Sequence, residues 1–435
     1  MQVRPALALV LLAAGCGGDR TAAPDPGRLD ALARRYVHLG LNLGRHDANY
    51  VDAWYGPDSL RAAAEADSLS VGQVRSSAES LLAVLGDRTP PYPDTLDRRR
   101  HRNLRAQLEA MTARARILAG ERLAFDEEAQ ALYDATPPRY DDGYFDSLLA
   151  RLDTLLPGRG RLADRYQRFR NRLMIPAKRV DTVFKAAIAA CRARTLTRIP
   201  LPPGERFELE YVKDTPWNAY NWYQGGYRSL IQVNLDFPVP LDRAVDLACH
   251  EGYPGHHVYN VLMEQSLVRA RGWMEFSMYP LFSPQSLIAE GTANFGIDMA
   301  FPPAERLALE RDSLFPLAGL DPALAEPNAA VRDVLLRLNF ARNEVARRYL
   351  DGELDAAAAA TAMQRYWLIP PDEAAKNVRF IDTYRSYVIN YNLGRELVSG
   401  WVGRRGGDDA GARWLAFRSL LSTPHLPSEL DEEDP

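Results

Sequence analysis

Residues 250–257 read His-Glu-Gly-Tyr-Pro-Gly-His-His, and this stretch holds three of the seven histidines in the chain. A catalytic zinc ion takes three protein ligands of the His, Asp or Glu type and keeps one position open for water. A glutamate directly beside such a ligand can accept a proton from that water. The stretch therefore predicts a metal site in which His250 is a ligand and Glu251 is the general base.

The second histidine ligand stands at an unusual spacing, because helical zinc motifs place it four residues after the first. On an unbroken helix His250 and His256 would lie on different faces, displaced by about 9 Å along the axis. Pro254 cannot donate a hydrogen bond to residue 250, and Gly255 tolerates unusual backbone dihedrals. We therefore expect the helix to kink there and to return His256 toward His250. His257 is a competing candidate, and we favour His256.

A carboxylate for the same site stands in a second segment, residues 286–298, which has small residues at four positions that allow close approach to another helix. Glu290, Asn294 and Asp298 share one face of this predicted helix. Glu290 would complete a set of two histidines and one glutamate, and Asn294 and Asp298 could orient the ligands. A solvated acidic face is the alternative. Such a ligand set suits Zn2+, although manganese or cobalt could also occupy it.

The rest of the chain predicts a mainly α fold with a small β-sheet beside the metal helix. Amphipathic helices follow one another over residues 28–198, and a Pro- and Gly-rich break follows at 199–204. Two short strands are predicted at 207–212 and 229–235, the second placed to pair with a substrate backbone. The aromatic run 217–223 either lines a pocket or packs in the core. Further helices are predicted at 241–252, 285–300, 328–350, 354–367 and 371–398.

Both ends of the chain lie outside the predicted helical domain of residues 29–427, whose active-site half covers about residues 205–400. Residues 1–15 resemble a signal peptide, with an apolar run too short to span a bilayer. Cys16 follows a lipobox-like sequence, so we expect a lipid on Cys16, a flexible tether over 16–28 and membrane attachment through that lipid. We therefore expect the protein to be exported to the periplasmic face of the outer membrane or to the cell surface. Residues 428–435 are expected to be an acidic disordered tail.

The overall composition excludes one class of partner. Lys and Arg number 53 and Asp and Glu number 57, which gives a net charge of -4 and no basic excess for a phosphate backbone. We therefore expect no nucleic acid partner. Apart from Cys16, only Cys191 and Cys249 are present, too few for a disulfide framework.

Three tyrosines near the C-terminal end, Tyr384, Tyr387 and Tyr391, are spaced so that a helix would bring them close together. A metal-dependent peptidase needs a donor for the oxyanion that forms at the scissile carbonyl, and a tyrosine hydroxyl can serve. Arg385 could hold a substrate carboxylate through its planar guanidinium.

The string at 250–257, the Ala-Glu-Gly-x-Ala at 289–293 and the late Tyr-x-x-Gly resemble the bacterial domain of unknown function 885 family, over most of the mature chain. That family is distantly similar to the helical gluzincins, which include angiotensin-converting enzyme and thermostable carboxypeptidases. The resemblance implies a large helical zincin-like fold, with His250 and His256 as zinc ligands, Glu290 as the third and Glu251 as the base. It aligns Tyr391 with the family's tyrosine, so Tyr391 is the first choice for the oxyanion and Tyr384 the second.

Together these features predict a zinc-dependent hydrolase that cleaves peptide or related amide bonds, with short peptides as partners. If Arg385 binds a free C terminus, the activity would be of the carboxypeptidase or dipeptidyl-carboxypeptidase type. A catalytically inactive lipoprotein that binds metal or peptide is the alternative, against which the retention of Glu251 argues. A hydrolase of another amide or an ester is a third interpretation.

Overall fold

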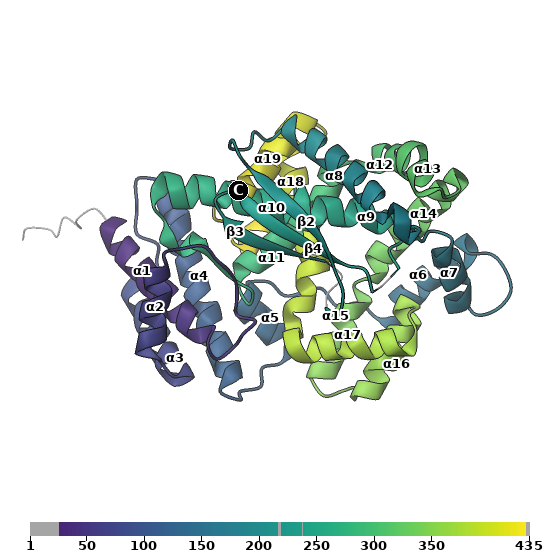
Figure 1. Cartoon of the computed structure of the whole chain (residues 1–435). Coiled ribbons are helices and arrows are strands. Elements are labelled where there is room, and N and C mark those ends of the chain that lie inside the picture. The colour runs from purple at the N-terminus through teal and green to yellow at the C-terminus, as the bar shows by residue number, and fades with distance from the viewer. Residues whose placement is uncertain (1–25, 216–218, 237, 432–435) are drawn as a thin grey trace, which may run out of the picture.

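The computed structural model describes residues 26–215, 219–236 and 238–431, and every structural statement below concerns these residues. The chain is 69% helical with only small sheets, which confirms the predicted mainly α fold (Figure 1). The expected signal peptide, the lipidated Cys16 and part of the aromatic run 217–223 lie outside the described residues. Within the described part, no helix is both long and apolar enough to cross a membrane.

Helices from the first 200 residues follow the predicted amphipathic pattern. Some begin with strong caps, as in the third helix, where Ser70 and Gln73 cap each other's backbone N–H groups. The helices are α1 (Pro26–Leu43), α2 (Asp58–Asp67), α3 (Val71–Leu85), α4 (Thr95–Leu118), α5 (Phe125–Tyr133), α6 (Asp142–Leu155), α7 (Leu162–Asn171) and α8 (Val180–Leu196). One short strand that the sequence did not reveal, β1 (Val51–Trp54), pairs antiparallel with β5 (Met278–Pro280).

The predicted sheet is present and has three strands, in the order β2-β4-β3. The two predicted strands are confirmed as β2 (Arg206–Val212) and β4 (Arg228–Asn234), and β3 (Ala219–Gly225) comes from the aromatic run. β4 is the central strand, parallel to β2 and antiparallel to β3. The expectation that residues 229–235 pair with a substrate backbone is therefore wrong, because both edges of β4 are already hydrogen-bonded. The sheet lies beside α10, which contacts both β3 and β4 (Figure 1).

The second half of the chain is helical, and two of its predicted helices are each divided. The pattern at 328–350 forms two helices that meet at residues 339–340, and the pattern at 371–398 is interrupted at Arg385, whose φ is 53°. The helices are α9 (Leu241–Leu247), α10 (His256–Met263), α11 (Pro284–Ala300), α12 (Pro303–Leu309), α13 (Phe315–Ala318), α14 (Ala325–Leu338), α15 (Ala341–Leu350), α16 (Ala356–Trp367), α17 (Pro371–Tyr384), α18 (Ile389–Gly406), α19 (Ala410–Ser422) and α20 (Pro427–Asp431).

The acidic tail begins later than expected. Residues 428–431 belong to α20, where Leu430 is fully buried and Glu429 forms an ion pair with Arg102 of α4. The prediction of disorder for these four residues is wrong, because one apolar side chain in the acidic run finds a place in the core.

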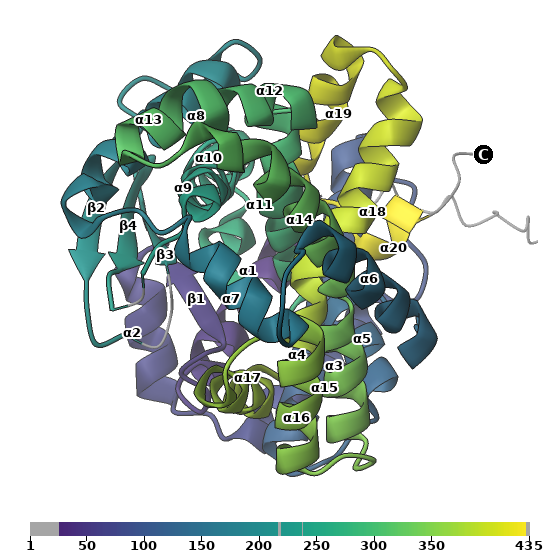
Figure 2. The same cartoon turned by 90° about the vertical axis from the view of Figure 1, so that its right-hand side faces the viewer.

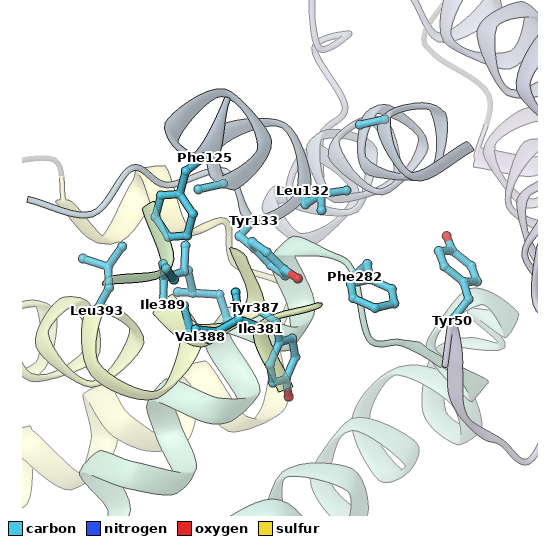
Figure 3. Packing of buried hydrophobic residues seen from close by; sticks show 14 of the residues in the cluster. Tyr50, Phe125, Leu132, Tyr133, Phe282, Ile381, Tyr387, Val388, Ile389 and Leu393 are labelled. Carbon is cyan, nitrogen blue, oxygen red and sulfur yellow. The ribbon is translucent and has the colours of Figure 1, made fainter. Parts of the chain in front are cut away.

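Two hydrophobic cores meet at α11, which lies in the interior of the molecule in both views (Figure 1, Figure 2). Leu287 belongs to the core built by α1–α6 and α14–α17, and Ile288 belongs to the core around α8–α10 and α18–α19. Figure 3 shows part of the first core, with Tyr133, Phe282 and Tyr387 packed among aliphatic side chains. A residue on α11 is therefore held by packing on both sides.

Candidate metal centre

The backbone of residues 250–257 breaks where the sequence predicts it to break. α9 continues into a π-helical segment, Ala248–Gly252, and α10 starts afresh at His256. The Gly255 N–H donates to the carbonyl oxygen of Cys249 at 2.9 Å. A Cβ on Gly255 would stand 1.9 Å from the carbonyl oxygen of His250, so only glycine allows the chain to turn back this closely.

This turn brings the two predicted histidines together with Glu290. The rings of His250 and His256 are 4.7 Å apart, edge to face. Glu290 on α11 lies beside both, with His250 Nε2 3.5 Å from one carboxylate oxygen and His256 Nε2 3.7 Å from the other. One ligand atom from each of the three residues lies within 4.8 Å of the others. This is a compact set of two imidazoles and one carboxylate, donors that suit zinc.

The position of Glu290 depends on the tight contact between α11 and α18. A Cβ on Gly291 would stand 2.4 Å from the carbonyl oxygen of Gly394, so two glycines let the helix backbones touch. Across this contact the hydroxyl of Tyr387 donates to Glu290 Oε1 at 2.8 Å. Tyr387 was one of the three tyrosines in the sequence pattern but not the one chosen for a role. The helix contact and this hydrogen bond fix the orientation of the carboxylate.

Burial dominates the electrostatics of the cluster. It lowers the pKa of His250 to about 4 and holds the pKa of His256 well below its usual value. Both imidazoles are therefore neutral near pH 7, the form that binds a metal ion. Burial also raises the pKa of Glu290 to about 7, against the hydrogen bond from Tyr387, which lowers it. Burial therefore disfavours the negative charge of Glu290, and a bound cation would stabilise that charge.

One atom of the cluster has no partner within the described residues. Glu290 Oε2 is buried and makes no hydrogen bond there, while Oε1 accepts from Tyr387. A buried carboxylate oxygen left without a donor is costly unless a cation or water satisfies it. The residues present therefore fit a divalent metal ion held by His250, His256 and Glu290.

Glu251 lies next to this set, and the sheet edge supports it. One of its carboxylate oxygens is 4.0 Å from His250 Nε2, and burial together with the charge of Glu290 raises its pKa to about 8. Its backbone carbonyl accepts a hydrogen bond from Asn221 of β3 at 2.6 Å. β3, rather than β4, is therefore the strand beside the metal helix.

Asp52 of β1 is a carboxylate near the cluster that sequence reasoning missed. Its charge raises the pKa values of Glu251 and Glu290, and burial raises its own pKa to about 7. The hydroxyl of Tyr220 donates to it. Nothing in the local sequence marks this residue, because β1 reaches the site only through its pairing with β5, more than 200 residues later.

His257, the alternative second ligand, points away from the cluster into a polar contact of its own. Its Nε2 lies 3.0 Å from a carboxylate oxygen of Glu205, and its Nδ1 lies 2.9 Å from the hydroxyl of Ser229. Since a carboxylate only accepts, Nε2 donates to Glu205 and Nδ1 accepts from Ser229. The ring has no nitrogen left for a metal ion.

The two residues of α11 that were predicted to orient the ligands, Asn294 and Asp298, have different partners. Asn294 makes a hydrogen bond with His250 and donates to the backbone carbonyl of Glu290 at 3.0 Å. Asp298 instead forms an ion pair with Arg395 of α18 at 2.6 Å. Only Asn294 contacts the predicted ligands.

The two tyrosines predicted for the oxyanion lie on either side of Tyr387. The rings of Tyr391 and Tyr387 are 5.6 Å apart, and those of Tyr384 and Tyr387 are 5.9 Å apart. Burial and the charge of Glu290 raise the pKa of Tyr391, whose hydroxyl is therefore a proton donor at neutral pH. Tyr384 is half-buried at the C-terminal end of α17, and its ring contacts the ring of Tyr387.

Arg385 already has a carboxylate partner within the protein. Its Nε donates to Glu128 of α5 at 2.6 Å, and Glu128 is fully buried. Glu128 also accepts from the backbone and hydroxyl of Ser386. Removing Arg385 would leave a buried carboxylate without its cation, so the structure gives this residue a role in stability.

Comparison with known proteins yields structural likeness only, since no family model matches the chain and no curated protein is similar in sequence. A predicted lipoprotein from Colwellia psychrerythraea matches with a TM-score of 0.51 and 13% identity, covering 83% of this chain and 68% of that one. A second predicted lipoprotein, of unknown function and from Shewanella oneidensis, matches with a TM-score of 0.48 and 13% identity, covering 95% of this chain and 79% of that one. An M32 carboxypeptidase from Deinococcus radiodurans gives 0.42 and 15%, covering 93% and 94%. The likeness to the Colwellia protein extends to the fold alone, and the other two scores are too low to establish a shared fold.

Proposed function

We propose that this chain is a metal-dependent hydrolase, with zinc as its metal, that cleaves peptide or related amide bonds in short peptides. The observation that carries the proposal is the convergence of His250, His256 and Glu290 with a fourth acidic residue, Glu251, directly beside them. A purely structural metal site has four protein ligands and no adjacent base. Three protein ligands to a metal ion, with the carboxylate of Glu251 beside them as a base, are the arrangement that suits metal-dependent hydrolysis.

The metal would supply the electrophile. A zinc ion held by these three residues would polarise a carbonyl group and would lower the pKa of water to about 7. The orphaned oxygen of Glu290 and the two neutral imidazoles support its binding there. Tyr387 and Asn294 would hold the ligands in orientation.

The protein groups around the metal would move the protons. Glu251 is placed to accept a proton from the attacking water and to deliver it to the leaving amine. The hydroxyl of Tyr391 would donate to the oxyanion that forms at the scissile carbonyl. β3 is one of the two edge strands of the sheet, so an extended substrate could add to it beside Glu251.

We also propose that the protein is exported and attached to the membrane by a lipid on Cys16. The support is the lipobox-like sequence that ends in Cys16, together with the description of two structural neighbours as lipoproteins.

The experiment that tests the function compares wild type with Glu251→Gln on a randomised library of short peptides after loading with zinc, with products identified by mass spectrometry. We expect cleavage by the wild type, a loss of about 10³-fold or more in the variant and equal zinc content in both. Zinc-loaded wild type that cleaves no peptide would refute the peptidase proposal and favour a protein that only binds. Equal rates in the two proteins would remove Glu251 from the mechanism.

A further inference from the structure

Arg342, near the start of α15, is an arginine without a carboxylate. Within the described residues, no Asp or Glu oxygen lies within 4.0 Å of its guanidinium nitrogens. One of its terminal nitrogens donates to the side-chain oxygen of Asn377 at 3.1 Å, and its Nε is buried with no hydrogen-bond partner. The guanidinium is partly exposed and keeps unused donors, of which Nε is shielded from solvent.

The four arginines that are buried among the described residues are paired, unlike the partly exposed Arg342. Each forms an ion pair with at least one carboxylate at 3.0 Å or less: Arg100 with Glu275, Arg114 with Asp47, Arg306 with Asp246 and Glu310, and Arg347 with Asp126. An unpaired charge in the interior is destabilising, so its presence calls for a partner that arrives from solution.

Aromatic rings surround the Arg342 guanidinium in place of a carboxylate. Its carbon lies 4.8 Å from the ring centre of Trp367, 4.7 Å from that of Phe380 and 5.8 Å from that of Tyr391. These rings hold the cation by cation–π attraction and remove its water, but they offer no negative charge. Burial accordingly lowers the pKa of Arg342 to about 10, and the group still carries its charge near pH 7.

This arginine is connected to the metal centre through two tyrosines. Tyr391 packs against the guanidinium on one side and against Tyr387, 5.6 Å away, on another. Tyr387 in turn donates to Glu290 of the metal cluster. Arg342 and Tyr391 are both partly exposed, as are Trp367 and Phe380, so the guanidinium is not sealed in the interior.

We propose that Arg342 is the receptor for the C-terminal carboxylate of the substrate, which rests on the proposed function and narrows it to peptides with a free C terminus. A planar guanidinium with open donors matches a carboxylate in a two-point hydrogen-bonded pair. Arg342 suits this role better than Arg385, because Arg385 already forms an ion pair with Glu128 and Arg342 has no carboxylate partner among the described residues. Arg342 is thus a specificity residue, and the metal cluster and Glu251 carry the chemistry.

The test measures a preference rather than a rate. Two randomised tetrapeptide libraries, identical except for a free or an amidated C terminus, are given to zinc-loaded wild type, Arg342→Gln and Arg342→Lys. We expect the wild type to prefer the free acids by about 100-fold in kcat/KM, since removing one member of a buried charged pair has effects of this size. Arg342→Gln should cleave both libraries equally, and Arg342→Lys should keep part of the preference.

Arg385→Gln is the matched control. It should unfold at a lower temperature than wild type because Glu128 loses its cation, but its molecules that remain folded should keep the full preference for free acids. The ratio of the two kcat/KM values does not depend on the fraction of folded protein, so a destabilised variant still gives a result. A wild type without preference, or an Arg342→Gln variant that keeps it, overturns the proposal.

Binding separates this proposal from the proposed function. The two libraries are passed over immobilised Glu251→Gln protein with and without Arg342→Gln. Retention of free acids over amides that depends on Arg342 supports the carboxylate receptor even when the wild type cleaves nothing. Equal retention of both libraries overturns it, whatever the catalytic result.

Discussion

Replacing Tyr387 with phenylalanine removes one hydroxyl and leaves the ring, and we expect this change to weaken metal binding. The hydroxyl donates to Glu290 Oε1 at 2.8 Å and is fixed by the contact of α11 with α18. A hydrogen bond to a charged group is worth about 1.5–3 kcal/mol. Loss of a group that orients a metal ligand weakens affinity by about 10–100-fold, or about 1.4–2.7 kcal/mol, so the two magnitudes agree.

The assay is competition for zinc with a chelator of known affinity, with thermal unfolding followed in parallel. Tyr384→Phe is the control, because Tyr384 lies in the same aromatic group and its hydroxyl makes no hydrogen bond with Glu290. We expect a 10–100-fold rise in Kd for Tyr387→Phe and a change of less than about twofold for Tyr384→Phe. A folded Tyr387→Phe protein with the affinity of wild type would refute the idea that this hydroxyl orients the carboxylate.

Three further changes test the packing that supports the site. In Gly255→Ala the new methyl would stand 1.9 Å from the carbonyl oxygen of His250, so we expect loss of zinc binding in titrations and about 1–3 kcal/mol of stability in denaturant unfolding. In Gly291→Ala the methyl would stand 2.4 Å from the carbonyl oxygen of Gly394, and we expect a similar loss of stability with weaker zinc binding as the helices separate. Burial and three nearby arginines lower the pKa of His425 to about 3 in the folded protein. Below about pH 6.5 the unfolded chain therefore binds a proton at His425 that the folded protein does not bind. Stability should therefore fall by about 2 kcal/mol more between pH 7 and 5 in wild type than in His425→Gln, measured by urea unfolding, and equal slopes would contradict it.

The parts of the fold that the sequence predicted are those that local patterns determine. Helical periodicity gave most helices, and alternation with β-branched residues gave β2 and β4. β1 has four residues, and its partner β5 lies more than 200 residues away, so neither carries a local signal. The break between α17 and α18 depends on Arg385, whose positive φ goes with its ion pair to Glu128 on α5.

The candidate site also contains some residues that local sequence patterns predicted and others that only the tertiary structure identifies. The sequence pattern predicted His250, Glu251 and His256 because they are close together in the chain. The Pro-Gly pair between them predicted the turn that brings the two histidines together. The choice of His256 over His257 could be argued only weakly, since it depends on Glu205 and Ser229, which arrive from other segments. Tyr387 could not be separated from its neighbours without knowing how the short segment Arg385–Val388, which precedes α18, packs against α11. No sequence pattern marked Arg342, because its distinguishing feature is the lack of a carboxylate partner in the folded structure.

Metal analysis of purified protein is the most direct test of the metal centre. Wild type, His250→Ala, His256→Ala and His257→Gln are loaded with zinc, dialysed and measured by elemental analysis, with circular dichroism to confirm folding. We expect about one zinc per chain in wild type and in His257→Gln, and loss in the two alanine variants. Zinc retained in folded His250→Ala or His256→Ala, or zinc lost only in His257→Gln, would contradict the proposed ligand set.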